Sequence, residues 1–351
     1  MSAETIISAP RQQDINLHKK VSPQMKTRKL GNSDLDISQI GLGCMTMTGI
    51  YGPADADQSI ATIHAAIDNG VSFIDTADAY GGGSNETLVG KVIANRRDKV
   101  LLATKFGNIY AKDPERGADG RPEYVREACE ASLRRLQTDV IDLYFQHRVD
   151  KGVPIEDTVG AMSDLVKEGK VRTIGLSECS SETLRRAHAV HPISALQSEL
   201  SLWTQFALND QIPVCRELGI TYVAYSPLGR GMLTGAIRED KDMAEKDRRR
   251  DHPRFQGNNL KHNVAVIAPI EALAKDKGCT PAQVALAWVL AQGNDIVPIP
   301  GSKRVEHLNL NIAATEIELS PEELEELHDS IPPDFTVGSR YPNAQMWTVD
   351  L

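Results

Sequence analysis

The segment IEDTVGAMSDLVKEGKVRTIGLS, residues 155–177, contains the pattern that decides the fold. Its first part has apolar residues at helical spacing and ends at Gly169, a residue type that commonly terminates helices. Its second part, VRTIGLS, is a short apolar run with β-branched residues, which is typical of a buried strand. The segment therefore predicts a helix followed by a strand, which is half of the repeating unit of a parallel sheet.

The same unit recurs along the chain. Residues 57–70 and 121–137 also have helical spacing, and further strand-like runs occur between such segments. These runs are SQIGLG (38–43), VSFID (71–75), VLLATK (100–105), VIDLYF (140–145), ISALQS (193–198), ITYVAYS (220–226) and DIVPIP (295–300). Together with VRTIGLS they favour an α/β fold of the (β/α)8 TIM-barrel type over an open doubly wound sheet.

Several segments flank this core pattern. MKTRKLG and LDISQ, on either side of Asn32-Ser33-Asp34, predict a short N-terminal β-hairpin at the floor of the barrel. Thr280 and Pro281 predict a helix start. Residues 229–262 are too charged to be core, so we expect an exposed loop with helical pieces on the C-terminal side of the barrel. Residues 1–25 are expected to form a flexible N-terminal extension, and residues 26–351 a single barrel domain.

Composition narrows the functional classes. The 351 residues carry a formal charge of −9, which argues against nucleic acid and anionic membranes as partners. No apolar run approaches the roughly 20 residues that span a bilayer, and the N-terminus does not resemble a signal peptide. The five cysteines show no metal or redox spacing and indicate reduced thiols in the cytoplasm. The sequence leaves the oligomeric state open, a homo-oligomer included.

Titratable residues follow the predicted strands at one end. The active site of such a barrel lies at the C-terminal ends of its strands. The second run ends on Asp75 with Tyr80 just beyond, the third ends on Lys105, and the fourth is followed by His147. Each residue alone has an ordinary explanation: a helix cap, a turn aromatic, a solvated strand end and a hydrogen-bonded structural histidine. Their recurrence at one rim points instead to catalysis.

These four groups form a coherent proton-transfer set. A tyrosine hydroxyl has a pKa near 10, and we expect Lys105 to lower the pKa of Tyr80, while Asp75 keeps the lysine charged. A neutral His147 would orient a carbonyl oxygen, and Tyr80 would give that oxygen a proton. None of these groups can supply a hydride, so the set requires a redox cofactor.

Motifs in register along the chain resemble the aldo-keto reductases. They are FIDTADAYGGGSNETLVG (73–90), LLATKFG (101–107), VIDLYFQHRVD (140–150), VRTIGLSE (171–178), ALQSELSLW (195–203), VAYSPLGRGMLTG (223–235) and DIVPIPGSKR (295–304). The resemblance covers roughly residues 26–340, and is strongest to the branch with plant auxin-induced-type and related microbial reductases. It implies a (β/α)8 barrel that binds NADPH without a Rossmann fold, with Tyr80 as proton donor.

The resemblance also implies a set of cofactor contacts. Ser177, Glu178 and Gln197 would hold the nicotinamide carboxamide, and Tyr225 would stack on the nicotinamide ring. Ser226, Leu228 and Arg230 would line the pyrophosphate, Ser302, Lys303 and Arg304 would meet the adenosine 2′-phosphate, and Asn311 would lie near the adenine. Four positions depart from the pattern: Glu178 stands where many relatives have asparagine, Thr46 adds a hydroxyl beside the nicotinamide, Leu200 replaces a tyrosine in ELSLW, and Leu310 removes an adenine contact.

The sequence thus predicts an NADPH-dependent oxidoreductase that reduces aldehydes or ketones to alcohols. The substrate mouth is expected to include Trp203, Phe106, Ile50 and Tyr51. Two alternatives remain. One is an aldolase or lyase that forms a Schiff base on Lys105, and the other is an NADPH-binding regulatory subunit without significant turnover. The residues do not specify the carbonyl compound, its stereochemistry or the preferred direction of the reaction.

Overall fold

The computed structural model describes residues 25–350. The expected N-terminal extension, residues 1–25, lies almost entirely outside the described residues.

Eight parallel strands form one sheet, in which each strand pairs with its neighbours in chain order. They are β3 (Leu42–Gly43), β4 (Phe73–Asp75), β5 (Leu101–Phe106), β6 (Ile141–Gln146), β7 (Val171–Ser177), β8 (Ile193–Glu199), β9 (Thr221–Tyr225) and β10 (Ile296–Pro298). The first and last strands meet, because Gly43 forms a parallel bridge with Gly301 and the Gly41 amide donates to the Pro298 carbonyl oxygen at 2.9 Å. The sheet therefore closes, which confirms the predicted (β/α)8 barrel.

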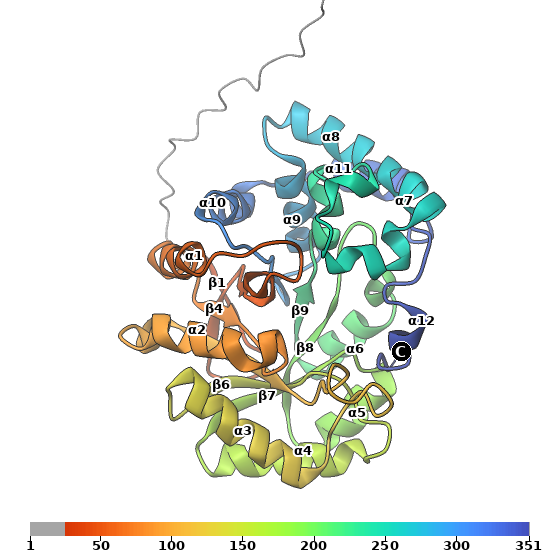
Figure 1. Cartoon of the computed structure of the whole chain (residues 1–351). Coiled ribbons are helices and arrows are strands. Elements are labelled where there is room, and N and C mark those ends of the chain that lie inside the picture. The colour runs from red at the N-terminus through yellow and green to blue at the C-terminus, as the bar shows by residue number, and fades with distance from the viewer. Residues whose placement is uncertain (1–24, 351) are drawn as a thin grey trace, which may run out of the picture.

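Helices surround the barrel on its outer side (Figure 1). They are α1 (Ala56–Asp68), α2 (Ser84–Ile93), α3 (Pro122–Leu136), α4 (Ile155–Lys167), α5 (Ser181–Val190), α6 (Gln211–Leu218), α7 (Gly257–Asn263), α8 (Ile267–Asp276), α9 (Pro281–Ala291), α10 (Val305–Ala313), α11 (Pro321–Ser330) and α12 (Asn343–Met346). The predicted helices over 57–70, 121–137 and 155–170 correspond to α1, α3 and α4. Helix α9 begins with the expected cap, because the Thr280 hydroxyl accepts from the Gln283 amide and Pro281 follows.

The predicted hairpin closes one end of the barrel. Strands β1 (Thr27–Lys29) and β2 (Asp36–Ser38) pair antiparallel, and Leu30 and Ile37 join the apolar core inside the barrel. The Gly31 amide donates to the Thr221 hydroxyl at 2.7 Å, at the first residue of β9. Gly31 has a φ of +56°, and a Cβ there would lie 2.6 Å from the Ser194 carbonyl oxygen, so this turn requires glycine.

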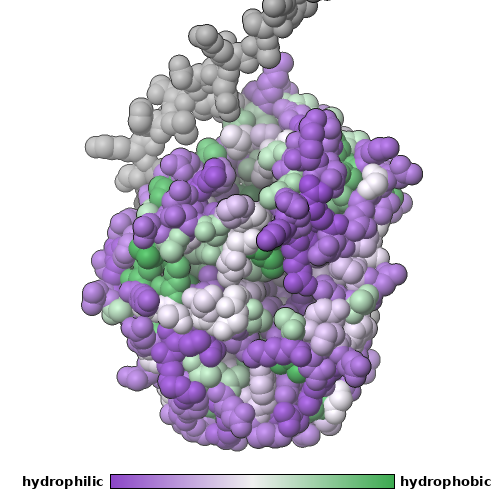
Figure 2. Space-filling model, viewed as in Figure 1, coloured by the Kyte–Doolittle hydropathy of each residue, from purple (hydrophilic) through white to green (hydrophobic). Residues whose placement is uncertain are grey.

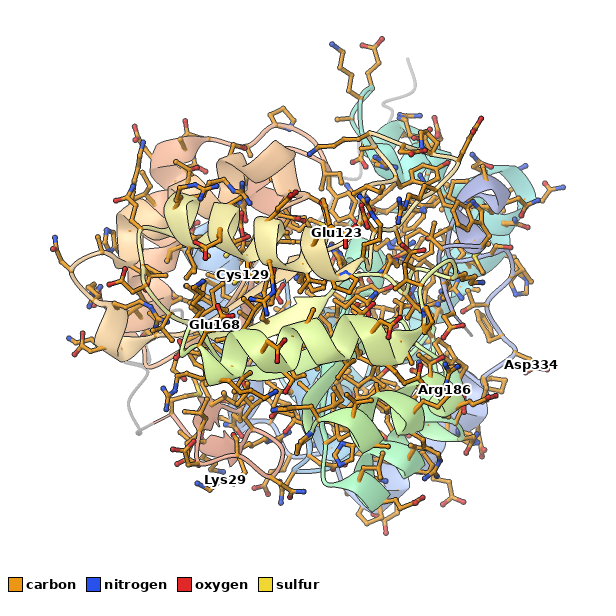
Figure 3. The ribbon with its side chains drawn as sticks, turned by 90° about the horizontal axis from the view of Figure 1, so that it is seen from below. Lys29, Glu123, Cys129, Glu168, Arg186 and Asp334 are labelled. Carbon is orange, nitrogen blue, oxygen red and sulfur yellow. The ribbon has the colours of Figure 1, made fainter. Side chains whose placement is uncertain are left out.

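Ion pairs link neighbouring helices on the outside. Figure 3 shows α3 and α4 side by side when the molecule is seen from below. Arg126 of α3 pairs with Asp164 of α4 at 3.1 Å, and Arg186 of α5 pairs with Glu156 of α4 at 2.8 Å. Such exposed pairs contribute only about 0–1 kcal/mol each. These ion pairs therefore add little to the stability of the barrel, and their main effect is to make the outer faces of the helices hydrophilic.

The surface in Figure 2 is mostly hydrophilic, with apolar residues in scattered patches. Val190 and Trp347 are the exposed large hydrophobic residues of the described chain. None of the helices in residues 25–350 combines the length and apolar composition needed to cross a membrane.

The expectation of an exposed loop with helical pieces over 229–262 is right about the helical pieces but wrong about the exposure of part of the segment. The segment forms short 3₁₀ turns followed by α7, and Met243, Asp247 and Phe255 within it are buried. Its charged residues bond within the protein: Arg249 donates to Asp247 at 2.6 Å and to the Arg230 carbonyl oxygen at 2.8 Å. Local ion pairing thus lets a highly charged sequence pack against the barrel.

Candidate active site

Strand β5 places Lys105 at the centre of the site. Ala103, two residues earlier, lies in the core inside the barrel, and alternate residues of a strand point to the same side. Lys105 therefore points inward at the carboxyl end of β5. Phe106 points the other way, lies fully buried in the core between strands and helices, and stacks on Tyr144 at 4.9 Å between ring centroids.

Lys105 joins two of the predicted catalytic residues. Its ammonium donates to Asp75 Oδ2 at 2.6 Å, to the Thr76 carbonyl oxygen at 2.8 Å and to the Tyr80 hydroxyl at 3.2 Å. The side chain is fully buried, so it is not a solvated strand end. These three acceptors occupy all three hydrogens of the ammonium group.

A glycine-rich turn directs Tyr80 toward the lysine. Gly81, Gly82 and Gly83 directly follow the tyrosine and all have positive φ values, which non-glycine residues seldom adopt. This backbone conformation reverses the chain between the end of β4 and the start of α2. The turn explains why a strand that ends on Asp75 is followed by a tyrosine and then by three glycines.

His147 completes the predicted set of four. It follows β6, and its ring lies edge-on to Tyr80 with 5.7 Å between the centroids. The ring is buried, and its Nδ1 atom has no hydrogen-bond partner among the described residues. The interpretation of a structural, hydrogen-bonded side chain therefore does not describe this histidine. The structure thus brings all four residues together at one rim, and their catalytic roles stay predictions.

The electrostatics differ from expectation in one respect. Burial raises the pKa of Tyr80 above 10, and this effect outweighs the charge of Lys105, which acts to lower it. The expectation of a lowered pKa for Tyr80 is therefore wrong in its net direction. Burial acts to lower the pKa of Lys105, but Asp75 and Tyr80 outweigh this effect and raise the pKa above 10.5, so the lysine is a cation. Burial, Arg148 and Lys105 lower the pKa of His147 well below 6.5, so its imidazole is neutral.

The residues expected at the nicotinamide carboxamide lie beside this set. Gln197 of β8 donates to Asp75 Oδ1 at 2.9 Å, so it also fixes the carboxylate that holds Lys105. Ser177 is buried at the end of β7. Glu178 follows it with a φ of +52° and receives two hydrogen bonds from Arg340, at 3.0 and 2.7 Å. Burial would raise the pKa of Glu178, but Arg340 lowers it to about 2.

Tyr225, the residue expected to stack on the nicotinamide ring, contacts the C-terminal segment. Its hydroxyl lies 2.8 Å from the Tyr341 hydroxyl. The Arg230 guanidinium lies over the Tyr341 ring, 4.7 Å from its centroid, and pairs with Glu199 at 3.2 Å. The Arg230 side chain thus forms a buried ion pair within the protein, and its expected contact with the pyrophosphate stays a prediction.

The turn after β9 has unusual backbone geometry. Ser226 and Arg230 have φ values of +48° and +57°, and Leu228 lies half-buried between them. Ser226, Arg230 and Glu178 are three of the four non-glycine residues with positive φ in residues 25–350. Strained backbone of this kind concentrates at functional sites.

The residues expected at the adenosine end lie around α10. Ser302 is buried, and its hydroxyl accepts from the Arg304 amide at 3.3 Å just before the helix. Lys303 and Arg304 line a cavity of about 350 Å³ together with Pro53, Ala54, Asp55 and Gln58. Arg304 has no carboxylate within 4 Å in the described part of the chain. Asn311, nearly two turns into α10, is buried.

The remaining substrate-mouth residues occupy different settings. Trp203 is almost fully buried, with its ring against Phe255 at 5.5 Å between centroids, and its indole nitrogen has no partner among the described residues. Ile50 and Tyr51 are half-buried, and Arg249 lies 5.1 Å from the Tyr51 ring centroid. Phe106 faces the helices and thus points away from the side of β5 that carries Lys105.

Arg148, Glu199, Arg340 and Tyr341 belong to this site, although sequence patterns alone did not indicate them. Arg148 directly follows His147 within the motif VIDLYFQHRVD, and this place in the sequence could have indicated that it lies at the rim. Arg340 and Tyr341 lie near the C-terminus, beyond the last strand–helix unit. Nothing in their local pattern indicates a contact with Glu178, 162 residues earlier in the chain.

Comparison with known proteins shows the family of the chain. Residues 39–331 match the Aldo/keto reductase family. "Probable aldo-keto reductase 1" of Glycine max is 48% identical over 322 residues, which cover 91% of this chain and 93% of that protein. The glycerol dehydrogenase of Gluconobacter oxydans is similar in structure, with a TM-score of 0.78 and 30% identity over 88% of this chain and 96% of the other.

A solved aldo-keto reductase from Klebsiella pneumoniae, in complex with NADPH, has a TM-score of 0.71 at 30% identity and covers 90% of this chain and 98% of its own. The match spans most of the chain, and the soybean relative is nearly half identical to it. The chain therefore belongs to the aldo/keto reductase family.

Proposed function

We propose that the protein reduces aldehydes or ketones to alcohols with NADPH as hydride donor. The observation that carries this proposal is the buried contact of the Lys105 ammonium with both Asp75 and the Tyr80 hydroxyl, at 2.6 and 3.2 Å. This contact holds a protonated tyrosine beside a neutral imidazole at the end of the barrel where its ligands bind.

Each of the four side chains has a distinct task in this proposal. Neutral His147 would hydrogen-bond the carbonyl oxygen and orient it toward Tyr80. Tyr80 would donate its hydroxyl proton as negative charge develops on that oxygen. The Lys105 cation would stabilise the tyrosinate that remains, and Asp75 would hold the lysine in position. Bound NADPH would supply the hydride that none of these groups can provide.

The residues along the rim fit this cofactor. Lys303 and Arg304 precede α10, where helix N–H groups and two cations suit a phosphate group. The Thr46 hydroxyl oxygen is buried without a partner among the described residues, and this is the residue that the family resemblance predicts beside the nicotinamide. Solved relatives from Klebsiella pneumoniae hold NADP and NADPH. We therefore assign the rim between Tyr225 and Arg304 to NADPH.

Two observations bear on the alternatives. A Schiff base requires a neutral lysine, whereas Lys105 is a cation whose three hydrogens are bonded to protein oxygens. A regulatory subunit without turnover would not need four proton-transfer groups arranged around one carbonyl position. Both alternatives predict a different outcome in the same assay.

NADPH oxidation at 340 nm, followed across aldehydes, ketones, quinones and pyridoxal, tests the proposal. We expect turnover with at least one class of carbonyl compound and none without NADPH. NADPH binding without turnover on the whole panel would favour the regulatory subunit. Conversion of substrate without NADPH, with borohydride trapping on Lys105, would favour the aldolase or lyase.

A further inference from the structure

Four buried arginines lie at the rim beside the proton-transfer set. They are Arg148, Arg230, Arg254 and Arg340, each no more than 8% exposed. The carboxylates among them are Glu178 and Glu199. His252, whose Nδ1 atom lies 3.4 Å from Arg230, is neutral, because burial and Arg230 lower its pKa to about 3. Four guanidinium groups therefore face two carboxylates, and the cluster carries an excess of positive charge.

Three of these arginines have a carboxylate partner. Arg340 pairs with Glu178 at 2.7 Å, while Arg230 and Arg254 approach Glu199 at 3.2 and 3.6 Å. Arg148 has no carboxylate within 4 Å in residues 25–350. Burying an unpaired cation is costly unless something compensates its charge. Of the two excess charges, one is shared by the arginines around Glu199, and the other lies on Arg148, which has no carboxylate partner.

The present contacts of Arg148 are all neutral. Its Nη1 donates to the His147 carbonyl oxygen at 2.8 Å, and its Nη2 donates to the Tyr341 hydroxyl at 3.2 Å. A guanidinium has five N–H donors, so donors remain for a further acceptor. Burial opposes the charge, but Tyr341, Tyr225 and Glu178 raise the pKa of Arg148, which therefore stays a cation.

Arg148 also lies close to the reacting groups. It directly follows His147, whose ring lies 5.7 Å from the Tyr80 ring between centroids, and its partner Tyr341 also contacts the hydroxyl of Tyr225 at the end of β9, at 2.8 Å. A group bound to Arg148 would thus be part of the same small molecule whose carbonyl oxygen lies between Tyr80 and His147. A planar carboxylate is the anion that a guanidinium binds with two parallel hydrogen bonds.

We propose that Arg148 binds a carboxylate on the substrate, so that the preferred substrates are aldehydes or ketones bearing a carboxylate a few bonds from the carbonyl. This inference rests on the proposed reductase function and narrows its substrate class. Arg148 would fix the acid end of the molecule, while Tyr80 and His147 act on the carbonyl end.

Matched pairs of substrates test this inference through their specificity constants, kcat/KM. One pair is benzaldehyde and its 4-carboxy derivative, and the other is butanal and the aldehyde acid 4-oxobutanoate. A charge-assisted hydrogen bond contributes about 1.5–3 kcal/mol, so we expect at least one acid to be preferred by about ten- to a hundredfold. In Arg148→Met this preference should collapse through a higher KM for the acid, and Arg148→Lys should retain part of it.

The control is Arg216→Met, which removes an exposed arginine that pairs with Asp295 away from the site, at 2.9 Å. We expect its acid preference to match the wild type. Benzoate and benzamide as inhibitors of benzaldehyde reduction by the wild type give a second readout that needs no variant, and benzoate should inhibit about tenfold better or more.

Equal kcat/KM values for the acids and their neutral counterparts, or equal inhibition by benzoate and benzamide, would overturn the inference about Arg148 while leaving the reductase function intact. An acid preference that survives in Arg148→Met would overturn it as well. Absence of NADPH-dependent turnover on every compound would instead overturn the proposed function, and this inference with it.

Discussion

Tyr80 illustrates how two opposing effects at one residue determine its chemistry. Burial raises its pKa above 10, although the Lys105 ammonium 3.2 Å away acts in the opposite direction. The hydroxyl therefore keeps its proton throughout the neutral range, which suits a proton donor in carbonyl reduction. The same property disfavours the reverse reaction, which needs tyrosinate as a base.

This balance predicts the pH dependence of both directions. A pKa raised above 10 leaves Tyr80 protonated below that value, and a pKa of His147 well below 6.5 leaves the imidazole neutral above it. We expect kcat for reduction to change less than about twofold between pH 6 and 9. Alcohol oxidation should rise with pH over the same range, because the tyrosinate fraction grows. A kcat for reduction that falls as the pH is lowered through 6.5 would contradict the neutral state assigned to His147.

At the scale of an element, α10 combines a helix start with two cations. The helix begins at Val305, directly after Lys303 and Arg304, which line the cavity next to Asp55 and Gln58 of the α1 region. Burial and the charges of Arg304 and Arg249 lower the pKa of Lys303, which is the expected result for a cation among other cations. A 2′-phosphate would relieve this repulsion.

The arrangement predicts selective loss of affinity for NADPH. Lys303→Met and Arg304→Met each remove a charge-assisted contact worth about 1.5–3 kcal/mol, so each should raise the Kd for NADPH by about ten- to a hundredfold. NADH lacks the 2′-phosphate, and its Kd should change by less than threefold. Fluorescence titration with both cofactors measures this, and Lys277→Met, a partly buried lysine of the outer helices, serves as the control. Equal losses for the two cofactors would exclude the assigned phosphate contact.

At the scale of the whole molecule, the C-terminal segment ties the barrel rim together. Arg340 reaches across from beyond α11 to Glu178 at the end of β7, and the residue after it, Tyr341, contacts Tyr225 of β9. A buried pair of this kind adds little net stability by itself, but removal of one partner leaves the other as an uncompensated buried charge. The contact of the C-terminal segment with the barrel therefore requires both Arg340 and Glu178.

Arg340→Leu should lower the free energy of unfolding by about 3–5 kcal/mol because Glu178 is left unpaired. The double variant Glu178→Gln/Arg340→Leu should recover part of this loss. In the wild type, the folded pKa of Glu178 is about 2 against a reference of 4.5. Its contribution is fully present above pH 4.5 and is lost as the pH falls toward 2. Urea denaturation at pH 7 and pH 3.5 measures both effects, and a double variant less stable than Arg340→Leu would contradict them.

The local parts of this molecule could be predicted from its sequence, and the long-range parts could not. Apolar runs that end on Asp75 and Lys105 indicate both the barrel and the rim, because strand periodicity and strand ends are local properties. The net pKa of Tyr80 depends on burial that only the folded chain supplies. The partners of Glu178 and Arg148 lie in a C-terminal segment without strand or helix periodicity. The sequence alone does not show which side of β5 faces into the barrel. That Lys105 points inward and Phe106 outward follows only from the register of the closed sheet.

The kcat of Tyr80→Phe shows whether Tyr80 donates the proton in an NADPH-dependent reduction. General acid catalysis contributes about 10²–10⁴-fold, so we predict a loss of that size in kcat for any carbonyl substrate of the wild type, with the Kd for NADPH within threefold of the wild-type value. Tyr124→Phe, a half-buried tyrosine of α3, should keep wild-type activity. A Tyr80→Phe variant that retains most of its turnover would contradict the account.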